Sequence, residues 1–182
     1  MQPDTLIPVP LTNRDMERLY PASREHIIEY SDLNKYRDLE EVLPETGSFK
    51  IVLIEYRQNS GHWILISRYK DMIEFFNPFG TKHSDADFVK SQSMNKYLGQ
   101  ASMHLQTLLQ KEANELRFDI VYNRVRFQSK RRDINTCGRH VLCRLICLRE
   151  YRMSLKKYIQ FMRQARQEHG GSYDQLVSSI IQ

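Results

Sequence analysis

Two residues far apart in the chain, Cys137 and His62, have the types and settings that nucleophilic catalysis requires. Cys137 stands directly before Gly138, where an amphipathic helix is predicted to begin. Unpaired backbone N–H groups and the helix dipole favour a thiolate at such a position. His62 follows a turn that contains Gly61 and opens a predicted strand. The pair therefore predicts a thiol nucleophile and an imidazole general base.

A third polar residue, Asn77, ends the strand that follows His62. Counting about seven residues outward from the turn at 69–71 brings Asn77 close to His62 across an antiparallel pair, where opposed Cβ atoms lie about 4.5–5.5 Å apart. The amide oxygen could then accept from one ring nitrogen and fix the tautomer. Beside the thiol, the small Gly138 leaves the backbone open, so that an N–H with a side-chain amide could hold an oxyanion.

The other two cysteines, Cys143 and Cys147, lie four residues apart near the apolar face of the same predicted helix. We expect them to behave as small hydrophobic residues. No metal site is predicted, because the sequence offers no second C-x-x-C or H-x-x-x-H pair to complete a zinc site. Three cysteines on one helix form a poor disulfide framework, which favours a reducing compartment.

The elements that must position these residues are strands and helices with different hydrophobic periods. Residues 49–56, 62–69 and 72–76 are rich in β-branched and aromatic side chains, and 119–127 alternates, which predicts strands. Their near-continuous apolar character predicts burial on both faces. Helical patterns are predicted for 83–116, from Cys137 onward, and for 154–168. The fold class is α+β, a mixed or antiparallel central sheet flanked by helices, in one domain of residues 1–182 with an extended arm at 1–10.

Composition excludes some classes of protein and leaves others open. Apolar residues make up 41% of the 182 residues, which is ordinary for a globular domain. No apolar run approaches the roughly 18 residues of a membrane span, and no secretory signal is visible, so we expect no membrane partner and no secretion. The net charge of +5 includes two basic clusters that could serve DNA or acidic partners, although a solvated basic face is the more usual explanation.

The order of the motifs resembles a known family. His62-Trp63, Asn77-Pro78-Phe79-Gly80, Gln128 and Cys137-Gly138 follow one another as in the adenovirus-type (adenain-like) maturation proteases and their relatives, the ubiquitin-like-protein-specific proteases. The Asn-Pro-Phe-Gly stretch resembles the Glu-Pro-Phe-Gly of the adenovirus protease. The stretch from Thr136 to His140 resembles proteases of virophages, large DNA viruses and Polinton-like elements.

The resemblance implies a papain-like fold in permuted order, His–Asn–Gln–Cys, and a role for each motif residue. His62 is the implied base, Asn77 orients it, and Cys137 attacks the scissile carbonyl. Gln128 is the implied oxyanion donor, with Asn135 as the alternative. Trp63 and Gly138 are expected beside the bound substrate.

The sequence departs from the family in two ways. Position 77 carries an amide instead of the carboxylate of the adenovirus enzyme, so His62 would be less basic. Gln128 lies nine residues before Cys137, farther than the family usually shows.

The implied function is a monomeric cysteine endopeptidase that cleaves viral capsid or precursor proteins at Gly-containing sites. It would act in the virion and inside the host cell, in the cytoplasm or viral factory, without a required cofactor but with DNA or a peptide as an activator. Two other functions stay open. One is an isopeptidase specific for ubiquitin-like proteins, and the other is a non-enzymatic basic module that binds nucleic acid.

Overall fold

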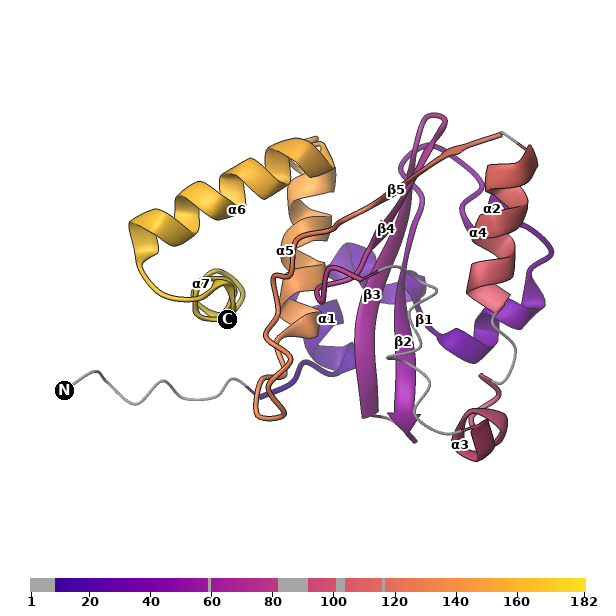
Figure 1. Ribbon diagram of the computed structural model, residues 1–182, viewed down its shortest axis with the longest axis horizontal. Coiled ribbons are helices and arrows are strands. Elements are labelled where there is room, and N and C mark those ends of the chain that lie inside the picture. Colours follow the sequence, from indigo (N-terminus) through magenta and orange to yellow (C-terminus); the bar gives the residue numbers. More distant parts are fainter. Residues whose placement is uncertain (1–8, 59, 82–91, 101–103, 116) are drawn as a thin grey trace.

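A five-stranded mixed sheet forms the centre of the protein, with helices on both of its faces (Figure 1). The computed structural model describes residues 9–58, 60–81, 92–100, 104–115 and 117–182. Most of the predicted N-terminal arm and part of the predicted helical stretch 83–116 lie outside the described residues. The predicted α+β class, with a mixed sheet flanked by helices, is confirmed. No described helix is both long and apolar enough to cross a membrane.

The sheet has the order β1-β2-β3-β4-β5, with antiparallel pairs in the middle and a parallel pair at each edge. The strands are β1 (Ile27–Glu29), β2 (Phe49–Arg57), β3 (Ser60–Tyr69), β4 (Met72–Phe76) and β5 (Asp119–Tyr122). The three predicted central strands are confirmed, whereas the short edge strand β1 was not predicted.

The strand predicted for 119–127 was too long, because β5 ends at Tyr122. The next residue, Asn123, satisfies the β4 backbone with its side chain. Its Oδ1 accepts from the Asn77 N–H at 2.8 Å, and its Nδ2 donates to the Asn77 carbonyl at 2.8 Å. The side-chain amide of Asn123 thus takes the place of the next backbone hydrogen bonds between β4 and β5. The chain then leaves the sheet toward the loop that carries Gln128.

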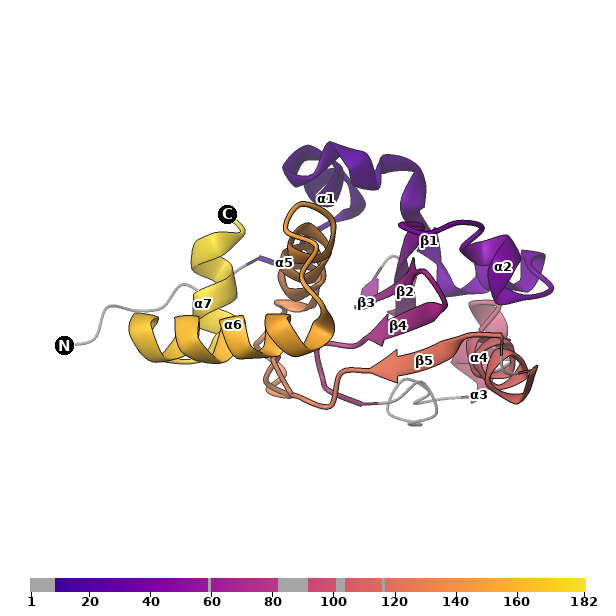
Figure 2. The ribbon, with the colours of Figure 1, turned by 90° about the horizontal axis from the view of Figure 1, so that it is seen from above.

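Helices at the two ends of the sequence cover one face, and helices from the middle of the sequence cover the other (Figure 2). The helices are α1 (Asn13–Leu19), α2 (Leu39–Val42), α3 (Gln92–Tyr97), α4 (His104–Glu115), α5 (Cys137–Arg149), α6 (Leu155–His169) and α7 (Tyr173–Ile180), with 3-10 segments at Pro21–His26 and Tyr30–Lys35.

Alternating residues of the central strands divide the core into two clusters, as their apolar character predicted. Ile51 and Leu53 point to the cluster formed with α1, α5, α6 and α7. Val52 and Ile54 point to the cluster formed with α2 and α4. Both faces of the sheet are therefore covered by closely packed side chains, and this packing holds β3 and β4 in place.

A buried ion pair fixes α5 against β4. Arg144, in the middle of α5, has a fully buried side chain. Its guanidinium donates to both carboxylate oxygens of Glu74 at 2.7 Å and to the Met153 carbonyl at 2.9 Å. Removing one partner of such a pair costs about 3–5 kcal/mol, because a charge is left buried alone. This contact sets the position of the helix that begins at Cys137.

Candidate active site

His62, in β3, is held by the amide of Asn77 at the end of β4. Nε2 of His62 lies 2.8 Å from Oδ1 of Asn77, and both side chains are buried. The same Oδ1 accepts from the Phe79 N–H at 3.0 Å, while Nδ2 donates to the Thr81 hydroxyl at 2.7 Å. Because a backbone N–H can only donate, these contacts fix the orientation of the amide. Nε2 must then carry the proton, and Nδ1 of the neutral ring carries the lone pair.

The register of the hairpin differs from the predicted one. Leu65 pairs with Phe76, so the ladder extended by one residue places Asn77 opposite Ile64 and not opposite His62. The two residues are therefore diagonal neighbours on the same face of the sheet. Diagonal pairs lie within reach of long side chains, which explains how the contact forms despite the shift.

Two glycines shape the backbone around the imidazole. A Cβ at Gly61 would come within 2.0 Å of the Ile54 carbonyl oxygen across β2 and β3. Gly80 has a φ of +70° and closes the turn that follows Asn77. This turn stacks the Phe79 ring on His62, with ring centroids 4.3 Å apart. The Asn77 amide thus binds the edge of the imidazole, and the Phe79 ring covers one of its faces.

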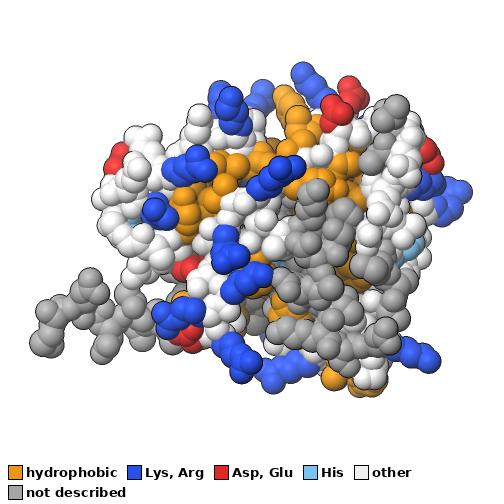
Figure 3. All heavy atoms as spheres, viewed as in Figure 1, with side chains coloured by type: hydrophobic (Ala, Val, Ile, Leu, Met, Phe, Trp, Pro, Cys, Tyr) orange, Lys and Arg blue, Asp and Glu red, His pale blue; other side chains and the backbone are white. Residues whose placement is uncertain are grey.

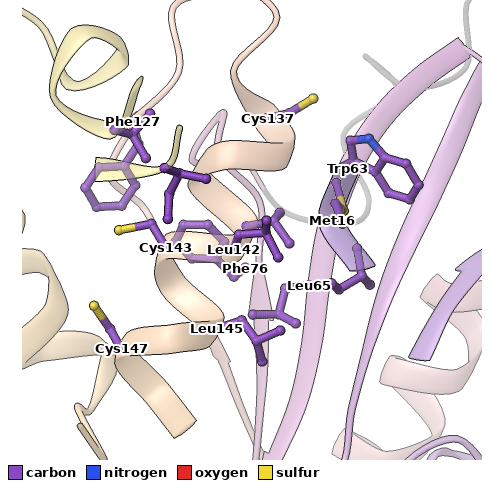
Figure 4. Packing of buried hydrophobic residues seen from close by; sticks show 14 of the residues in the cluster. Met16, Trp63, Leu65, Phe76, Phe127, Cys137, Leu142, Cys143, Leu145 and Cys147 are labelled. Carbon is purple, nitrogen blue, oxygen red and sulfur yellow. The ribbon is translucent and has the colours of Figure 1, made fainter. Parts of the chain in front are cut away.

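Cys137 is the first residue of α5, as predicted, and its side chain is almost fully buried. Figure 4 shows its sulfur directed to the side opposite the sulfurs of Cys143 and Cys147, toward the strand that carries Trp63. Backbone N–H groups of Trp63 and Gly138 interact with the thiol. These donors approach from β3 and from the first turn of the helix.

Burial disfavours the charged forms of both Cys137 and His62. Burial raises the pKa of the Cys137 thiol above its ordinary value, although the backbone N–H groups around it act in the opposite direction. The lowered thiol pKa expected from the helix N-terminus is therefore wrong for the free protein, because desolvation outweighs the N–H groups. Burial also lowers the pKa of His62 to about 4, despite the hydrogen bond to Asn77.

A single pocket of about 390 Å³ brings several of the predicted residues together. His62 from β3, Gln128 from the loop after β5, and Cys137 from α5 line it. Asn135, the alternative oxyanion donor, lines it as well. The remaining walls are Tyr56, Gly61, Phe79, Lys130, Arg131, Arg132 and Ile134. Asn77 lies behind the imidazole, outside the lining.

Gln128 is buried, and its position depends on the turn after β4. The N–H groups of Phe127 and Gln128 both donate to the Pro78 carbonyl, at 2.9 and 3.0 Å. The side-chain Nε2 donates to the Ile134 carbonyl at 3.1 Å, while Oε1 has no hydrogen-bond partner among the described residues. Nε2 carries two protons, so one is satisfied inside the loop and the second can serve a ligand.

Trp63 and Gly138 lie beside the site without lining the pocket. The Trp63 indole donates to the Leu11 carbonyl at 3.2 Å. A Cβ at Gly138 would approach Met16 Cε at 2.7 Å and Leu11 Cβ at 3.1 Å. The missing side chain at 138 therefore lets the N-terminal segment pack against the start of α5.

A polar cluster next to Cys137, centred on Asp174 of α7, was not predicted from the sequence. Its carboxylate accepts from the Thr136 hydroxyl, from the Ser129 N–H at 3.0 Å and from His140 Nε2 at 3.2 Å. Burial opposes ionisation of Asp174, but these hydrogen bonds outweigh it and lower its pKa. One carboxylate thus ties α7 to the loop that carries Gln128 and to residues on both sides of Cys137. A signal for the cluster was His140, which stands three residues after Cys137.

Comparison with known proteins gives one relationship. The chain is 32% identical over 155 residues to a protein of the Sputnik virophage, "Uncharacterized protein V9", and the match covers 85% of each chain. The chain belongs to the family of this virophage protein. The relationship supports the expectation of a viral protein. No model of a known protein family matches the chain, and no solved structure matches it.

Proposed function

We propose that this protein is a cysteine endopeptidase with a papain-like site in permuted chain order. The observation that carries the proposal is the shared pocket of Cys137, His62 and Gln128, with Nε2 of His62 held by Asn77. A nucleophile, a base and a group that orients the base are the parts that acyl transfer by a thiol needs.

The hydrogen bond between His62 and Asn77 supports one direction for the proposed proton transfer. Asn77 fixes the Nε2–H tautomer, so Nδ1 of His62 takes the thiol proton while Sγ of Cys137 bonds to the scissile carbonyl carbon. The imidazolium then protonates the leaving amine as the C–N bond breaks. Water, deprotonated by the same nitrogen, attacks the thioester, which releases the acid and restores the thiol.

Charge develops on the carbonyl oxygen during both steps. The Gln128 amide is the proposed side-chain donor, and the backbone N–H groups at the start of α5 are the proposed main-chain donors. Because burial disfavours the charged form of both groups, we expect the thiolate to form only as substrate binds or reacts. The site therefore avoids a buried ion pair in the free protein.

The proposed substrates are viral capsid or precursor proteins cleaved at Gly-containing sites. Kinship with a virophage protein supports the viral setting, and the motif order supports the reaction and the preference for Gly. An isopeptidase for ubiquitin-like proteins would share the same chemistry. Efficient processing of a ubiquitin-like conjugate, with no cleavage of other proteins, would select that alternative.

The test is a cleavage assay on a tryptic peptide library, in which mass spectrometry identifies the new termini. Cys137→Ala should abolish all new cleavages, whereas Cys143→Ala, a buried cysteine on the same helix, should leave the cleaved set unchanged. Equal cleavage by the Cys137→Ala variant would remove this residue from the reaction. A wild-type protein that cuts neither the library nor a ubiquitin-like conjugate would refute the proposed function.

A further inference from the structure

The turn that follows β4 supports His62 through a backbone group and through a side chain. The Phe79 N–H donates to Oδ1 of Asn77 at 3.0 Å, and the same oxygen lies 2.8 Å from Nε2 of His62. The ring of Phe79 stacks on the imidazole, with centroids 4.3 Å apart and an angle of 8° between the two planes. Phe79 therefore acts on His62 twice, at the ring edge through Asn77 and on the ring face through the stack.

The stacked ring also borders the space in which the reaction is proposed to occur. Phe79, His62 and Cys137 all line the pocket of about 390 Å³. The Pro78 carbonyl, in the same turn, accepts from the Gln128 N–H at 3.0 Å. The backbone that carries Phe79 is thus tied to the loop that carries Gln128, which keeps the aromatic ring over the imidazole.

The proposed reaction places a positive charge on this buried imidazole. When Nδ1 of His62 takes the thiol proton, the ring gains a positive charge. The sulfur gains a negative charge, which passes to the carbonyl oxygen as the C–S bond forms. The amide of Asn77 has no charge of its own to balance the ring. The face of an aromatic ring is the negative part of its quadrupole and attracts a cation within about 6 Å of its centroid. The Phe79 ring lies well within this range.

Resting on the proposed function, we infer that Phe79 is a positioning residue that stabilises the charged form of His62 while the ring holds the thiol proton. The stack does so without a further ionised side chain, whose burial would itself be costly. A cation over an aromatic face gains roughly twofold to thirtyfold in its equilibrium constant. The proton affinity of His62 and kcat should both depend on Phe79 to this extent.

Other titratable groups around the imidazole must be held constant in any test. His140 of α5 disfavours a positive charge on His62. The titratable side chains that line the pocket with it are Tyr56, Lys130, Arg131, Arg132 and Cys137. Asp133 accepts from Arg131 at 2.6 Å. Exposed Lys and Arg side chains, of which Figure 3 shows many on one face of the molecule, are screened by salt. Variants compared at one high salt concentration therefore differ only in the side chain at position 79.

The first test measures the titration of His62 by NMR, in protein with ¹³C-labelled histidine and without any substrate. Burial lowers the pKa of His62 to about 4. The comparison is therefore made in the Asn77→Asp variant, where a carboxylate moves this pKa toward its ordinary value near 6.5. Adding Phe79→Leu removes the aromatic face and keeps an apolar cover. The proton affinity of His62 should then fall by roughly twofold to thirtyfold.

Two controls separate the aromatic face from packing. Phe79→Tyr keeps the face and should leave the titration of His62 unchanged. A fluorinated phenylalanine at position 79 keeps the shape of the ring and weakens its negative face, so the proton affinity should fall with each added fluorine. His140, which lies near Phe127, is recorded in the same spectra and should keep its titration in every variant.

The second test uses the pH dependence of cleavage, with Asn77 retained. Activity needs the neutral imidazole and is lost as the pH falls through the pKa of His62. Phe79→Leu lowers this pKa, so the acid limb of kcat/KM should move to lower pH while kcat falls by roughly twofold to thirtyfold. Phe79→Tyr should restore both. Loss of packing alone would lower kcat and leave the acid limb in place.

The inference and the proposed function fail in different ways. If the titration of His62 is the same with Phe, Leu and fluorinated Phe at position 79, the inference is wrong and the proposed catalytic site stands. A pKa of His62 that rises in Phe79→Leu would also overturn it, because the ring would then act by excluding water. If the titration shifts as expected but the wild-type protein cleaves nothing, the contact between the rings stands and the proposed function is wrong.

Discussion

Two buried histidines near Cys137 each make a hydrogen bond through Nε2, but their surroundings differ. Nε2 of His62 meets the Asn77 amide at 2.8 Å, and Nε2 of His140 meets the Asp174 carboxylate at 3.2 Å. Burial lowers the pKa of both rings. Only His62 lines the pocket, whereas His140 is enclosed near Phe127 and α7.

The difference suits the two rings to different proposed roles, proton exchange for His62 and structural support for His140. An amide orients His62 without adding charge, and the ring borders the space where a substrate would react. A carboxylate holds His140 together with Thr136 and Ser129, which immobilises the start of α5 and the Gln128 loop. The hairpin thus presents the proposed base, while the α5–α7 cluster supports the backbone around the proposed nucleophile.

The largest expected effect comes from replacing each of the two histidines separately with alanine. His62→Ala should lower kcat by roughly 10²- to 10⁴-fold, the usual contribution of a general base. His140→Ala should mainly lower the thermal midpoint of unfolding, because it leaves a cavity and removes a partner of buried Asp174. Steady-state kinetics and thermal unfolding on both variants measure the contrast. An inactive but fully stable His140→Ala variant, together with an active His62→Ala variant, would reverse the two roles.

A smaller effect is expected for Asp174→Asn, which keeps the shape of the side chain and removes its charge. Loss of charge-assisted bonds to His140 and Thr136 should cost about 1–3 kcal/mol of unfolding free energy. Looser placement of the Gln128 loop should lower kcat more than it raises KM. Denaturant unfolding and kinetics measure both effects, with Asp71→Asn, at an exposed position in the turn between β3 and β4, as the control. An unchanged unfolding free energy of the Asp174→Asn variant would show that the charge of Asp174 does not stabilise the fold.

The smallest effects are expected at Asn77. Asn77→Ala should reduce turnover only partly, because the thiol and imidazole remain while the tautomer is less well fixed. Asn77→Asp should change the pH dependence instead. Activity needs the neutral ring and is lost as the pH falls through the pKa of His62, about 4. A carboxylate raises that pKa, so the acid limb of kcat/KM should move toward the ordinary value near 6.5. An acid limb unmoved by Asn77→Asp would exclude His62 as the titrating group.

Patterns of local sequence predicted the central part of the fold. Strands β2, β3 and β4 and the start of α5 at Cys137 follow from runs such as Ile51–Ile54 and from the change to a helical period. Edge strand β1 has three residues, too few for a recognisable pattern, and its parallel pairing with β2 depends on tertiary contacts. The length of β5 could not be predicted, because the side chain of Asn123 ends the ladder.

The pocket residues were predicted by motif order, but their supports were not. Asp174 lies far along the chain in a short helix, and nothing nearby indicates that its carboxylate reaches Thr136. Arg144 and Glu74 each interrupt an apolar element, which was a visible signal of a buried ion pair. The sign of the Cys137 pKa shift depends on burial, which a helix-start rule does not include.

The most direct test of the central claim is the pH dependence of Cys137 alkylation by iodoacetamide, in the wild-type protein and in His62→Ala. If His62 accepts the thiol proton, the wild-type rate should rise through about pH 4, where the ring loses its proton, reach a plateau, and rise again in the alkaline range as the thiol ionises. His62→Ala should lose the plateau and keep only the alkaline rise. A single alkaline rise, identical in both proteins, would show that the imidazole does not serve the sulfur.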